Sequence, residues 1–291
     1  MRHLKAPAAA WKRWYDFLAG REEWFVVHGL AAAGQDLWRW RYMNAGYVDE
    51  DDVVDDTGSV MEQGDRLSIR LYEHLLSGVD VVDRDVVEVG SGRGGGCEHV
   101  ARTRKARSVV GVDLSEAAVA FCQRQPGVRG LSFVVGNAEA LPFDDAAVDV
   151  VLNVESSHCY DDFSRFVGEV HRVLRPGGRL LLTDFRPREL WPEVRQRCAE
   201  RFRVVVEHDI TAHIVRALER RWQHPLTGVL ATGFESPLAR QRWSETAGPH
   251  VSTSMGEATD TDAFFFLKDS RSNELFSSGE WRYLSLVLVK D

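Results

Sequence analysis

The stretch VVEVGSGRGGG, residues 86–96, is a short apolar run that opens into a glycine-rich turn. Gly90, Gly92 and Gly95 match the pattern G-x-G-x-x-G, and Asp113 closes the next apolar run, VVGVD. Glycines at such a turn let the backbone approach a ligand closely, and an acidic residue after the next strand can bind a ribose diol. We therefore expect two adjacent parallel strands that present a nucleoside-containing ligand at their carboxyl ends.

The residue two positions before the first glycine distinguishes the candidate ligands. The glycine pattern also suits a nicotinamide dinucleotide, but Glu88 stands where dinucleotide sites usually carry an apolar residue. A carboxylate there favours a ligand with an ammonium group and disfavours one with a pyrophosphate. S-adenosylmethionine (SAM) has a zwitterionic methionyl end and a sulfonium centre, so it is the cofactor that the sequence predicts.

Further motifs follow in order along the chain. They are GNAEALPF (136–143), DVVLNVESSHCY (149–160) and EVHRVLRPGGRLLLTDF (169–185). Together with the glycine turn, they resemble the sequential motifs of class I SAM-dependent methyltransferases. Within that superfamily, the run over 151–178 and the DFRP that follows look closest to phthiotriolone-type lipid methyltransferases. They are more distantly similar to natural-product sugar O-methyltransferases and sterol-type C-methyltransferases.

Length and charge restrict the classes of protein and substrate. The chain of 291 residues exceeds a minimal core and suits an α/β domain with a helical cap. The formal net charge of −8 argues against a nucleic-acid partner, because phosphate binding requires a basic surface. The resemblance implies that the substrate is instead a small, largely apolar natural product or lipid.

Cysteine usage and hydropathy indicate the cellular compartment. The four cysteines have neither C-x-x-C nor metal-ligand spacing, which is typical of reduced thiols. Lys12 and Arg13 interrupt any signal-peptide core, and no apolar run approaches the roughly 20 residues of a membrane span. The sequence therefore predicts a cytoplasmic protein without a membrane span.

Alternating apolar runs and amphipathic stretches between 86 and 185 predict a parallel sheet with right-handed crossovers. Ser115 suits the N-cap of a helix over 116–124, a second helix is expected over 163–174, and RPGG ends it before a turn. The expected strands are 86–89, 108–112, 131–135, 148–153, 179–185, 202–210 and 281–290. The fold class is therefore α/β, a Rossmann-like seven-stranded methyltransferase sheet. The resemblance implies that the seventh strand is antiparallel and lies between the fifth and the sixth.

Four segments are expected along the chain. They are a helical, aromatic-rich N-terminal cap (1–80), a SAM-binding core (81–210), a helical substrate lid (211–278) and a final core strand (279–291). The aromatic residues of the cap are Trp11, Trp14, Tyr15, Phe17, Trp24, Phe25, Trp38, Trp40, Tyr42 and Tyr47. They pack on the sheet, line a substrate chamber or form a contact in a homo-oligomer, and these interpretations stay open. Tyr15 is expected to help close the SAM site.

The glycine turn and the next strand carry the expected contacts to the methionyl group and the ribose. The family resemblance implies that Gly90, Ser91 and Gly92 pass under the methionyl chain, with Glu88 near its ammonium group. It also implies that Asp113 binds the ribose hydroxyls.

The later motifs carry the expected contacts to adenine and the sulfonium. The resemblance places Leu114 against the adenine face and Asn137 and Ala138 at its edge. Asn137 stands where many relatives carry an aspartate, and its amide oxygen can still accept from the exocyclic amine. Asn153 and Val154, at the end of the fourth strand, are expected beneath the sulfonium.

His158 and Asp184 are the candidate catalytic residues. His158 follows the fourth strand, where the methyl group would emerge, and a neutral imidazole can take the proton of an alcohol or phenol. Asp184 ends the adjacent fifth strand and could orient the imidazole. Matching residues occur in the sugar O-methyltransferases that the chain resembles. With Asp161 and Asp162 nearby but no supporting spacing, no metal is expected.

The motif after the fourth strand narrows the acceptor. The sequence reads NVES in place of the Asp/Asn-Pro-Pro-Tyr/Phe motif with which amino-methylating enzymes hold a planar nitrogen. We predict methylation of a hydroxyl with His158 as base. The alternative is C-methylation of a prenyl, terpenoid or sterol-like alkene through a carbocation that aromatic rings stabilise. More remote alternatives are a nicotinamide-dependent oxidoreductase and a non-catalytic SAM-binding protein.

Overall fold

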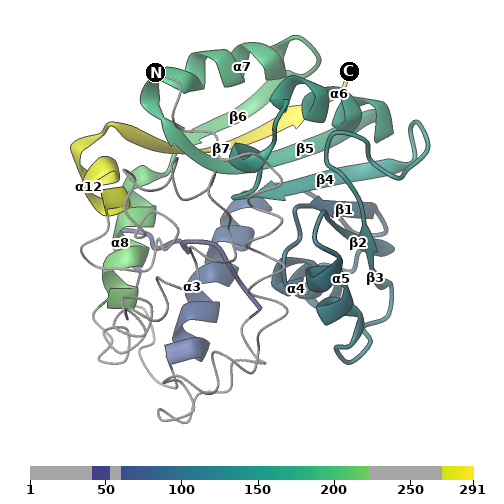
Figure 1. Ribbon diagram of the computed structural model, residues 1–291, viewed down its shortest axis with the longest axis horizontal. Helices are drawn as coiled ribbons and strands as arrows, with labels where there is room; N and C mark the ends of the chain where they lie inside the picture. The colour runs from purple at the N-terminus through teal and green to yellow at the C-terminus, as the bar shows by residue number, and fades with distance from the viewer. Residues whose placement is uncertain (1–40, 53–59, 223–270) are drawn as a thin grey trace, which may run out of the picture.

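The computed structural model describes residues 41–52, 60–222 and 271–291, and a seven-stranded sheet forms its centre (Figure 1). The strand order is β3-β2-β1-β4-β5-β7-β6. Strands β1 to β5 pair in parallel, and β7 pairs antiparallel with both β5 and β6. The predicted sheet is confirmed, with its antiparallel strand between the fifth and sixth. The strands are β1 (Asp85–Val89), β2 (Ser108–Asp113), β3 (Leu131–Val135), β4 (Val148–Val154), β5 (Leu174–Pro187), β6 (Arg203–Asp209) and β7 (Trp281–Val289).

Helices cover both faces of the sheet. In Figure 1, α6 and α7 lie above the sheet, and α3, α4, α5 and α8 lie below it. The described helices are α3 (Val60–Leu75), α4 (Gly95–Thr103), α5 (Glu116–Gln123), α6 (Phe163–Val173), α7 (Trp191–Ala199), α8 (Thr211–Trp222) and α12 (Arg271–Ser278). Two short 3-10 turns are η4 (Ser157–Cys159) and η5 (Arg188–Leu190). None of the helices in the described residues is long and apolar enough to cross a membrane.

Local sequence explains where the helices begin. The Ser115 hydroxyl accepts a hydrogen bond from the backbone N–H of Ala118 at 3.2 Å, which confirms the predicted N-cap of α5. Asp162 caps α6 in the same way, accepting from the N–H of Arg165 at 3.0 Å. The buried side of α6 carries apolar residues at helical spacing, as the periodicity predicted.

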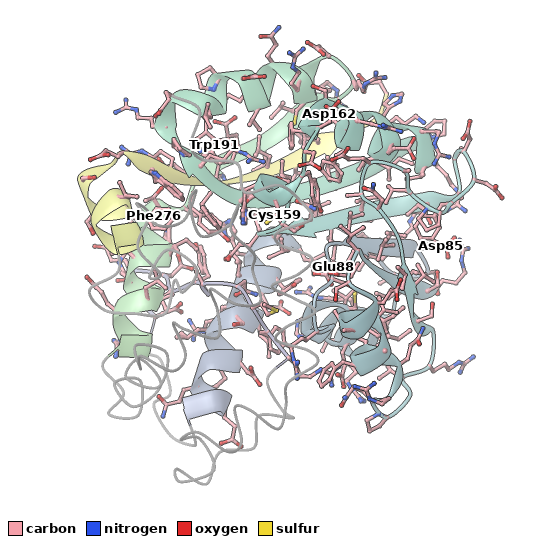
Figure 2. The ribbon with its side chains drawn as sticks, in the orientation of Figure 1. Asp85, Glu88, Cys159, Asp162, Trp191 and Phe276 are labelled. Atoms are coloured by element: carbon pink, nitrogen blue, oxygen red, sulfur yellow. The ribbon has the colours of Figure 1, made fainter. Side chains whose placement is uncertain are left out.

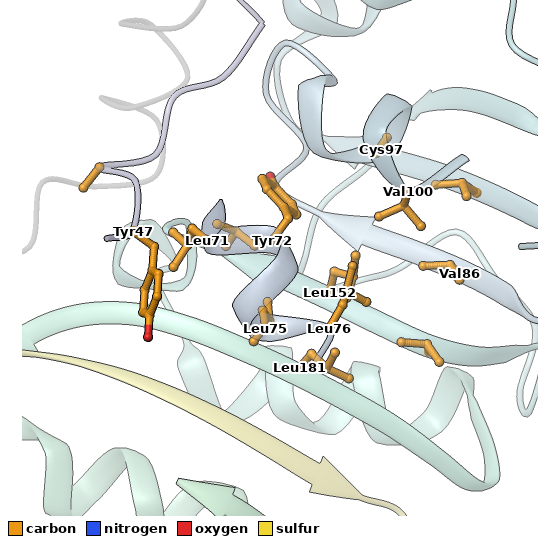
Figure 3. Close-up of a cluster of buried hydrophobic side chains, with 14 of the residues drawn as sticks. Tyr47, Leu71, Tyr72, Leu75, Leu76, Val86, Cys97, Val100, Leu152 and Leu181 are labelled. Carbon is orange, nitrogen blue, oxygen red and sulfur yellow. The ribbon is translucent and has the colours of Figure 1, made fainter. Parts of the chain in front are cut away.

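Each face of the sheet has its own hydrophobic cluster. Residues of α3, α4, α5, α8 and α12 pack on one face, and residues of α6 and α7 pack on the other. Figure 3 shows Leu75 and Leu76 near Leu152 and Leu181 of the sheet. All four are buried, so truncating one of them to alanine is expected to cost about 2–5 kcal/mol. Helices α3, α8 and α12, which come from the segments predicted as cap and lid, therefore share one core with the sheet.

The RPGG segment departs from the prediction. Helix α6 ends at Val173, and β5 begins at Leu174, so RPGG bulges within the strand and is not a turn before it. Gly177 adopts a φ of 75° and donates to the carbonyl of Lys290 at 2.7 Å. The N–H of Lys290 donates to Gly178 at 2.9 Å. The residue that follows β7 thus supplies backbone partners that hold the bulge against the sheet.

The two segments outside the core are only partly described. Residues 41–52 have no regular secondary structure, whereas α3 is helical as expected for the cap. Of the aromatic residues predicted for the cap, Tyr42 and Tyr47 are described, and the eight from Trp11 to Trp40 lie outside the described residues. The segment predicted as a lid begins with α8 and ends with α12, and positions 223–270 lie outside the described residues.

Candidate active site

A cavity lies where β1, β2 and β4 end. Five predicted cofactor residues line it: Gly90, Asp113, Leu114, Asn137 and Ala138. The remaining lining residues are Val89, Val112, Ser115, Gly136, Glu139, Ser156, Cys159 and Tyr160. Figure 2 labels Cys159 at this edge of the sheet. The carboxyl ends of parallel strands thus meet where the sequence predicted a ligand.

Asp113 is the acidic group of the cavity. It ends β2, is 7% exposed, and accepts from the N–H of Gly92 at 2.7 Å and from the N–H of Ser115 at 2.9 Å. These bonds fix the carboxylate between the glycine turn and the start of α5. Each carboxylate oxygen can accept more than one hydrogen bond, so the group can also receive ribose hydroxyls.

The lining of the cavity combines apolar and polar side chains. Val112, Leu114 and Ala138 supply the apolar surface. The side-chain oxygen of Asn137 accepts from the N–H of Glu139 at 2.8 Å, which makes a local turn of this segment. The residues present fit a nucleoside: apolar surface for a base, and a buried carboxylate for a diol.

A polar cluster beneath the glycine turn sets its shape. The side-chain nitrogen of Asn153 lies 2.9 Å from the carbonyl oxygen of Val89 and 2.8 Å from each of the hydroxyl oxygens of Ser156 and Tyr160, and its two N–H groups donate within this set. A Cβ at Gly90, where φ is 76°, would lie 2.3 Å from the Ser156 hydroxyl. Only glycine fits this position. Ser156 and Tyr160 were missed from the sequence, although they stand in the motif that contains Asn153.

Two polar atoms near the turn lack protein partners. Within the described residues, the hydroxyl of Ser91 and the side-chain oxygen of Asn153 are buried and make no hydrogen bond. Buried polar atoms are rarely left in this state, and a bound ligand is one source of the missing partners. A zwitterionic methionyl group carries donors and acceptors for such atoms.

Glu88 has a different environment from the one expected. Its two carboxyl oxygens are bonded to the Tyr72 hydroxyl at 2.6 Å and to the Cys97 thiol at 2.8 Å, and the residue does not line the cavity. Along β1, Val89 points to the cavity, so Glu88 points to the other face, toward α3 and α4. Burial raises the pKa of Glu88 to about 7, although the thiol and the hydroxyl oppose that rise.

His158 and Asp184 meet at the carboxyl edge of the sheet, on η4 and β5. The ring nitrogen Nδ1 lies 2.7 Å from Asp184 Oδ1, and the N–H of His158 donates to Oδ2 at 2.9 Å. Asp184 is fully buried, and it also accepts from the Ser157 hydroxyl and the N–H of Phe185. Burial alone would raise the pKa of Asp184, but the imidazole, the Arg186 guanidinium and the Ser157 hydroxyl outweigh it and lower that pKa to about 2.

The ionised carboxylate determines how the ring of His158 is protonated. Because a carboxylate only accepts, Nδ1 carries the hydrogen of the bond to Asp184. In a neutral imidazole, Nε2 is then the basic nitrogen. The arrangement can therefore orient an imidazole for proton transfer and stabilise the imidazolium that results.

The other predicted site residues are not among those that line the cavity. They are Ser91, Gly92, Asn153, Val154, His158 and Asp184, in addition to Glu88. Tyr15 lies outside the described residues. Within the described residues, no group of three or more histidine, cysteine, aspartate or glutamate side chains could hold a metal ion.

Comparison with known proteins places this geometry in a family. Residues 87–182 match the family described as a methyltransferase domain. The chain is 38% identical over 211 residues to phthiotriol/phenolphthiotriol dimycocerosates methyltransferase 1 of Mycobacterium ulcerans, covering 72% of this chain and 73% of the relative. It is 41% identical over 180 residues to a fatty-acid O-methyltransferase of Mycolicibacterium smegmatis, covering 62% and 65% of the two chains.

A solved structure shares the fold. The geranyl diphosphate C-methyltransferase of Streptomyces coelicolor, in complex with S-adenosyl-L-homocysteine (SAH), superposes with a TM-score of 0.61 at 20% identity. The match covers 88% of this chain and 94% of that one. The sequence relationships extend over more than two thirds of the first relative and include every motif that builds the cavity. The chain therefore belongs to the family of these lipid-type enzymes and is a class I methyltransferase that uses SAM.

Proposed function

We propose that this enzyme methylates an oxygen atom of a lipid-like acceptor and that His158 receives the proton of the acceptor hydroxyl. The observation that carries the proposal is the double contact between His158 and the buried, ionised Asp184. The names of the two relatives, a phthiotriol-type and a fatty-acid O-methyltransferase, support lipid-like substrates.

The proposed SAM site is the cavity and the turn beside it. Asp113 would hold the ribose. The adenine would be held by Leu114, Asn137 and Ala138. Gly90, Ser91 and Gly92 would pass under the methionyl group, with Asn153 and Val154 at the sulfonium. When bound, SAM supplies an electrophilic methyl group and leaves as SAH. The carboxyl group of Glu88 is bonded to Tyr72 and Cys97, so Glu88 would affect the cofactor only indirectly, by supporting the strand that leads into the glycine turn.

In the proposed reaction, this chain moves one proton. The acceptor O–H bond breaks as its oxygen forms the bond to methyl carbon, and Nε2 of His158 takes the proton. Asp184 keeps Nδ1 protonated and offsets the positive charge that appears on the ring. The remaining rate acceleration would come from the alignment of the acceptor oxygen with the methyl group, because well-oriented reacting groups have large effective molarities.

The proposed lid borders this edge of the sheet. Phe276 of α12 packs edge-on against Phe185, and the Phe185 ring stacks on Trp281 at 5.6 Å between centroids. The ring of His158 lies 4.2 Å from that of Phe185. Helix α12 would therefore border an apolar acceptor whose reacting oxygen points at the imidazole.

The same aromatic cluster supports a second candidate, methyl transfer to an alkene carbon. Phe185 lies against His158, and the buried rings of Phe276 and Tyr283, together with Trp281, pack on Phe185 behind it. Aromatic faces stabilise a cation. In that reaction, the ring wall contributes more than the imidazole does.

Acceptor screening with two variants distinguishes the candidates. Native enzyme, His158→Gln and Phe185→Leu are assayed with methyl-labelled SAM against hydroxy lipids, fatty acids and isoprenoid alkenes. Oxygen transfer by His158 predicts a labelled methyl ether, lost in His158→Gln and largely kept in Phe185→Leu. Label on carbon, with Phe185→Leu the more damaging change, would refute the base and favour the second candidate.

A further inference from the structure

Residues 41–48, here called the strap, cross the edge of the site without regular secondary structure. At one end, the carbonyl of Arg41 accepts from the N–H of Gly95 at 3.2 Å, and the sulfur of Met43 is 3.5 Å from the position a Cβ would take at Gly92. At the other end, the N–H of Tyr47 donates to Leu67 of α3 at 3.0 Å. The strap thus joins the glycine turn to α3.

One side chain just after β4 contacts the middle of the strap. Ala45 is buried, and its backbone N–H donates to Oε1 of Glu155 at 2.7 Å. The hydroxyl of Tyr283, on β7, donates to the same oxygen at 2.5 Å. Glu155 follows directly on β4, so its carboxylate links three parts of the chain at the carboxyl edge of the sheet.

The backbone of Glu155 is strained. Its φ is 47°, in the left-handed region that favours glycine, and its N–H is fixed by the carbonyl of Thr183 at 2.9 Å. Neither glycine nor asparagine occupies this position, although both adopt this conformation more readily. Strained residues at the edge of a site are retained where the side chain has a task.

We infer that Glu155 is a positioning residue for methyl transfer, because its carboxylate docks the strap over the glycine turn. Ala45, which it holds, lies two residues from Met43, which faces Gly92. Without that acceptor, the buried N–H of Ala45 loses this hydrogen bond, and the middle of the strap is held less firmly against the turn. To hold the strap, residue 155 needs a side chain long enough to contact Ala45 and Tyr283 and an oxygen that accepts their hydrogen bonds. It does not need a negative charge.

Two substitutions at Glu155 distinguish the effect of side-chain length from the effect of charge. Glu155→Gln keeps the length of the side chain and an oxygen that accepts from Ala45 and Tyr283, but it cannot take up a proton. Glu155→Asp keeps the charge, but it is one methylene shorter, so it cannot reach both donors. Glu207→Gln and Glu207→Asp are the matched controls, because Glu207 is an exposed carboxylate of β6 bonded to Arg195.

The measurement is the dissociation constant of SAH for each full-length variant, together with hydrogen exchange of the Ala45 amide. Glu155→Asp should raise the dissociation constant of SAH about tenfold, which corresponds to about 1.4 kcal/mol of binding free energy. It should also speed hydrogen exchange of the Ala45 amide. Glu155→Gln should stay within about threefold of the native value, and both Glu207 variants should match it. In the native enzyme, SAH should slow exchange at Ala45, which tests the strap even if a variant fails to fold.

The opposite order, with Glu155→Gln inactive at native SAH affinity and Glu155→Asp active, would make Glu155 a proton acceptor and overturn the inference. Unchanged exchange at Ala45 on SAH binding would overturn it as well. The inference rests on the proposed cofactor position over the glycine turn, which Asp113→Ala tests separately. If Asp113→Ala binds SAH with native affinity, the proposed cofactor position is wrong. If Asp113→Ala loses SAH affinity but Glu155→Asp does not, the cofactor position stands and only the role of the strap is refuted.

Discussion

Asp184 holds His158 at two atoms, since Oδ1 lies 2.7 Å from the ring nitrogen Nδ1 and Oδ2 accepts from the backbone N–H at 2.9 Å. The side chain and the backbone of the histidine are thus fixed by one buried carboxylate. The ring cannot turn without breaking a charge-assisted hydrogen bond. This pair is the basis of the proposed acid–base step.

Removal of the imidazole should therefore affect the chemistry and not the binding of the cofactor. With a hydroxyl acceptor, we expect His158→Ala to lower kcat about 10²-fold or more, as for the loss of a general base, with the SAM affinity nearly unchanged. Single-turnover rates and calorimetric titration measure the two effects. A variant with full activity on a confirmed hydroxyl acceptor would eliminate the role.

Asp184→Asn should have a smaller effect on kcat than His158→Ala. The amide oxygen of the new asparagine can still accept the hydrogen bond from the imidazole. The substitution removes the negative charge that offsets the imidazolium. Because the pKa of Asp184 is lowered to about 2, its ionised form also stabilises the fold above its ordinary pKa, and that contribution disappears as the pH falls toward 2. Urea unfolding at pH 7 should therefore show Asp184→Asn to be less stable than native enzyme.

Glu88 predicts a pH dependence of the opposite sign. Its pKa is raised to about 7 in the folded state, so the native protein binds more protons than the unfolded chain between about pH 4.5 and 7. Stability from this group is full at the acid end of that window and falls as the pH rises, by about 3 kcal/mol in total. Glu88→Gln removes the ionisation, so its stability relative to native enzyme should rise from pH 5 to pH 8. A constant difference over this range would contradict the buried environment of Glu88.

The imidazole of His74 lies in a ring stack with Tyr47 and His213, at centroid distances of 4.5 and 4.7 Å along the stack. Burial, and then the neighbouring His208 and His213, lower the pKa of His74 to about 4. The unfolded chain therefore binds the proton first, and stability is lost as the pH falls from about 6.5 toward 4. His74→Gln should flatten this acid limb in thermal unfolding, and an unchanged limb would show that another group causes it.

The glycine turn offers a steric test. Gly90→Ala places a Cβ 2.3 Å from the Ser156 hydroxyl at a φ of 76°, so it should displace the polar cluster and abolish SAM binding. Gly127→Ala is the matched control, because a Cβ there meets no atom within 4 Å and the backbone is not left-handed. Calorimetry on both variants checks the expectation. Native SAM affinity in Gly90→Ala would show that the turn is not part of the cofactor site.

Most of the sheet was predictable because its signals are local. The strand β3 and the N-cap Ser115 depend on residues within a few positions, and the glycine turn is a pattern of neighbours. The His158–Asp184 pair followed from a rule of topology, since adjacent parallel strands end at the same edge. Such inferences do not need tertiary contacts.

The missed features depend on residues that are distant in sequence. The partners of Glu88 come from α3 and α4, and the side chain of Glu155 meets Ala45 and Tyr283, which are 110 and 128 positions away. The RPGG bulge likewise depends on Lys290 at the far end of the chain. No local pattern encodes these contacts, so the sequence could indicate that Glu88 matters but not what it touches.

The most direct test of the central claim is the position of a labelled methyl group after one turnover. Native enzyme and His158→Gln are each mixed with carbon-13-methyl SAM and a hydroxy-lipid acceptor, and the product is examined by NMR. The account predicts a methyl ether from native enzyme, formed at least about 10²-fold more slowly by His158→Gln at equal SAM occupancy. A methyl group on carbon, or equal rates of ether formation by the two proteins, would contradict it.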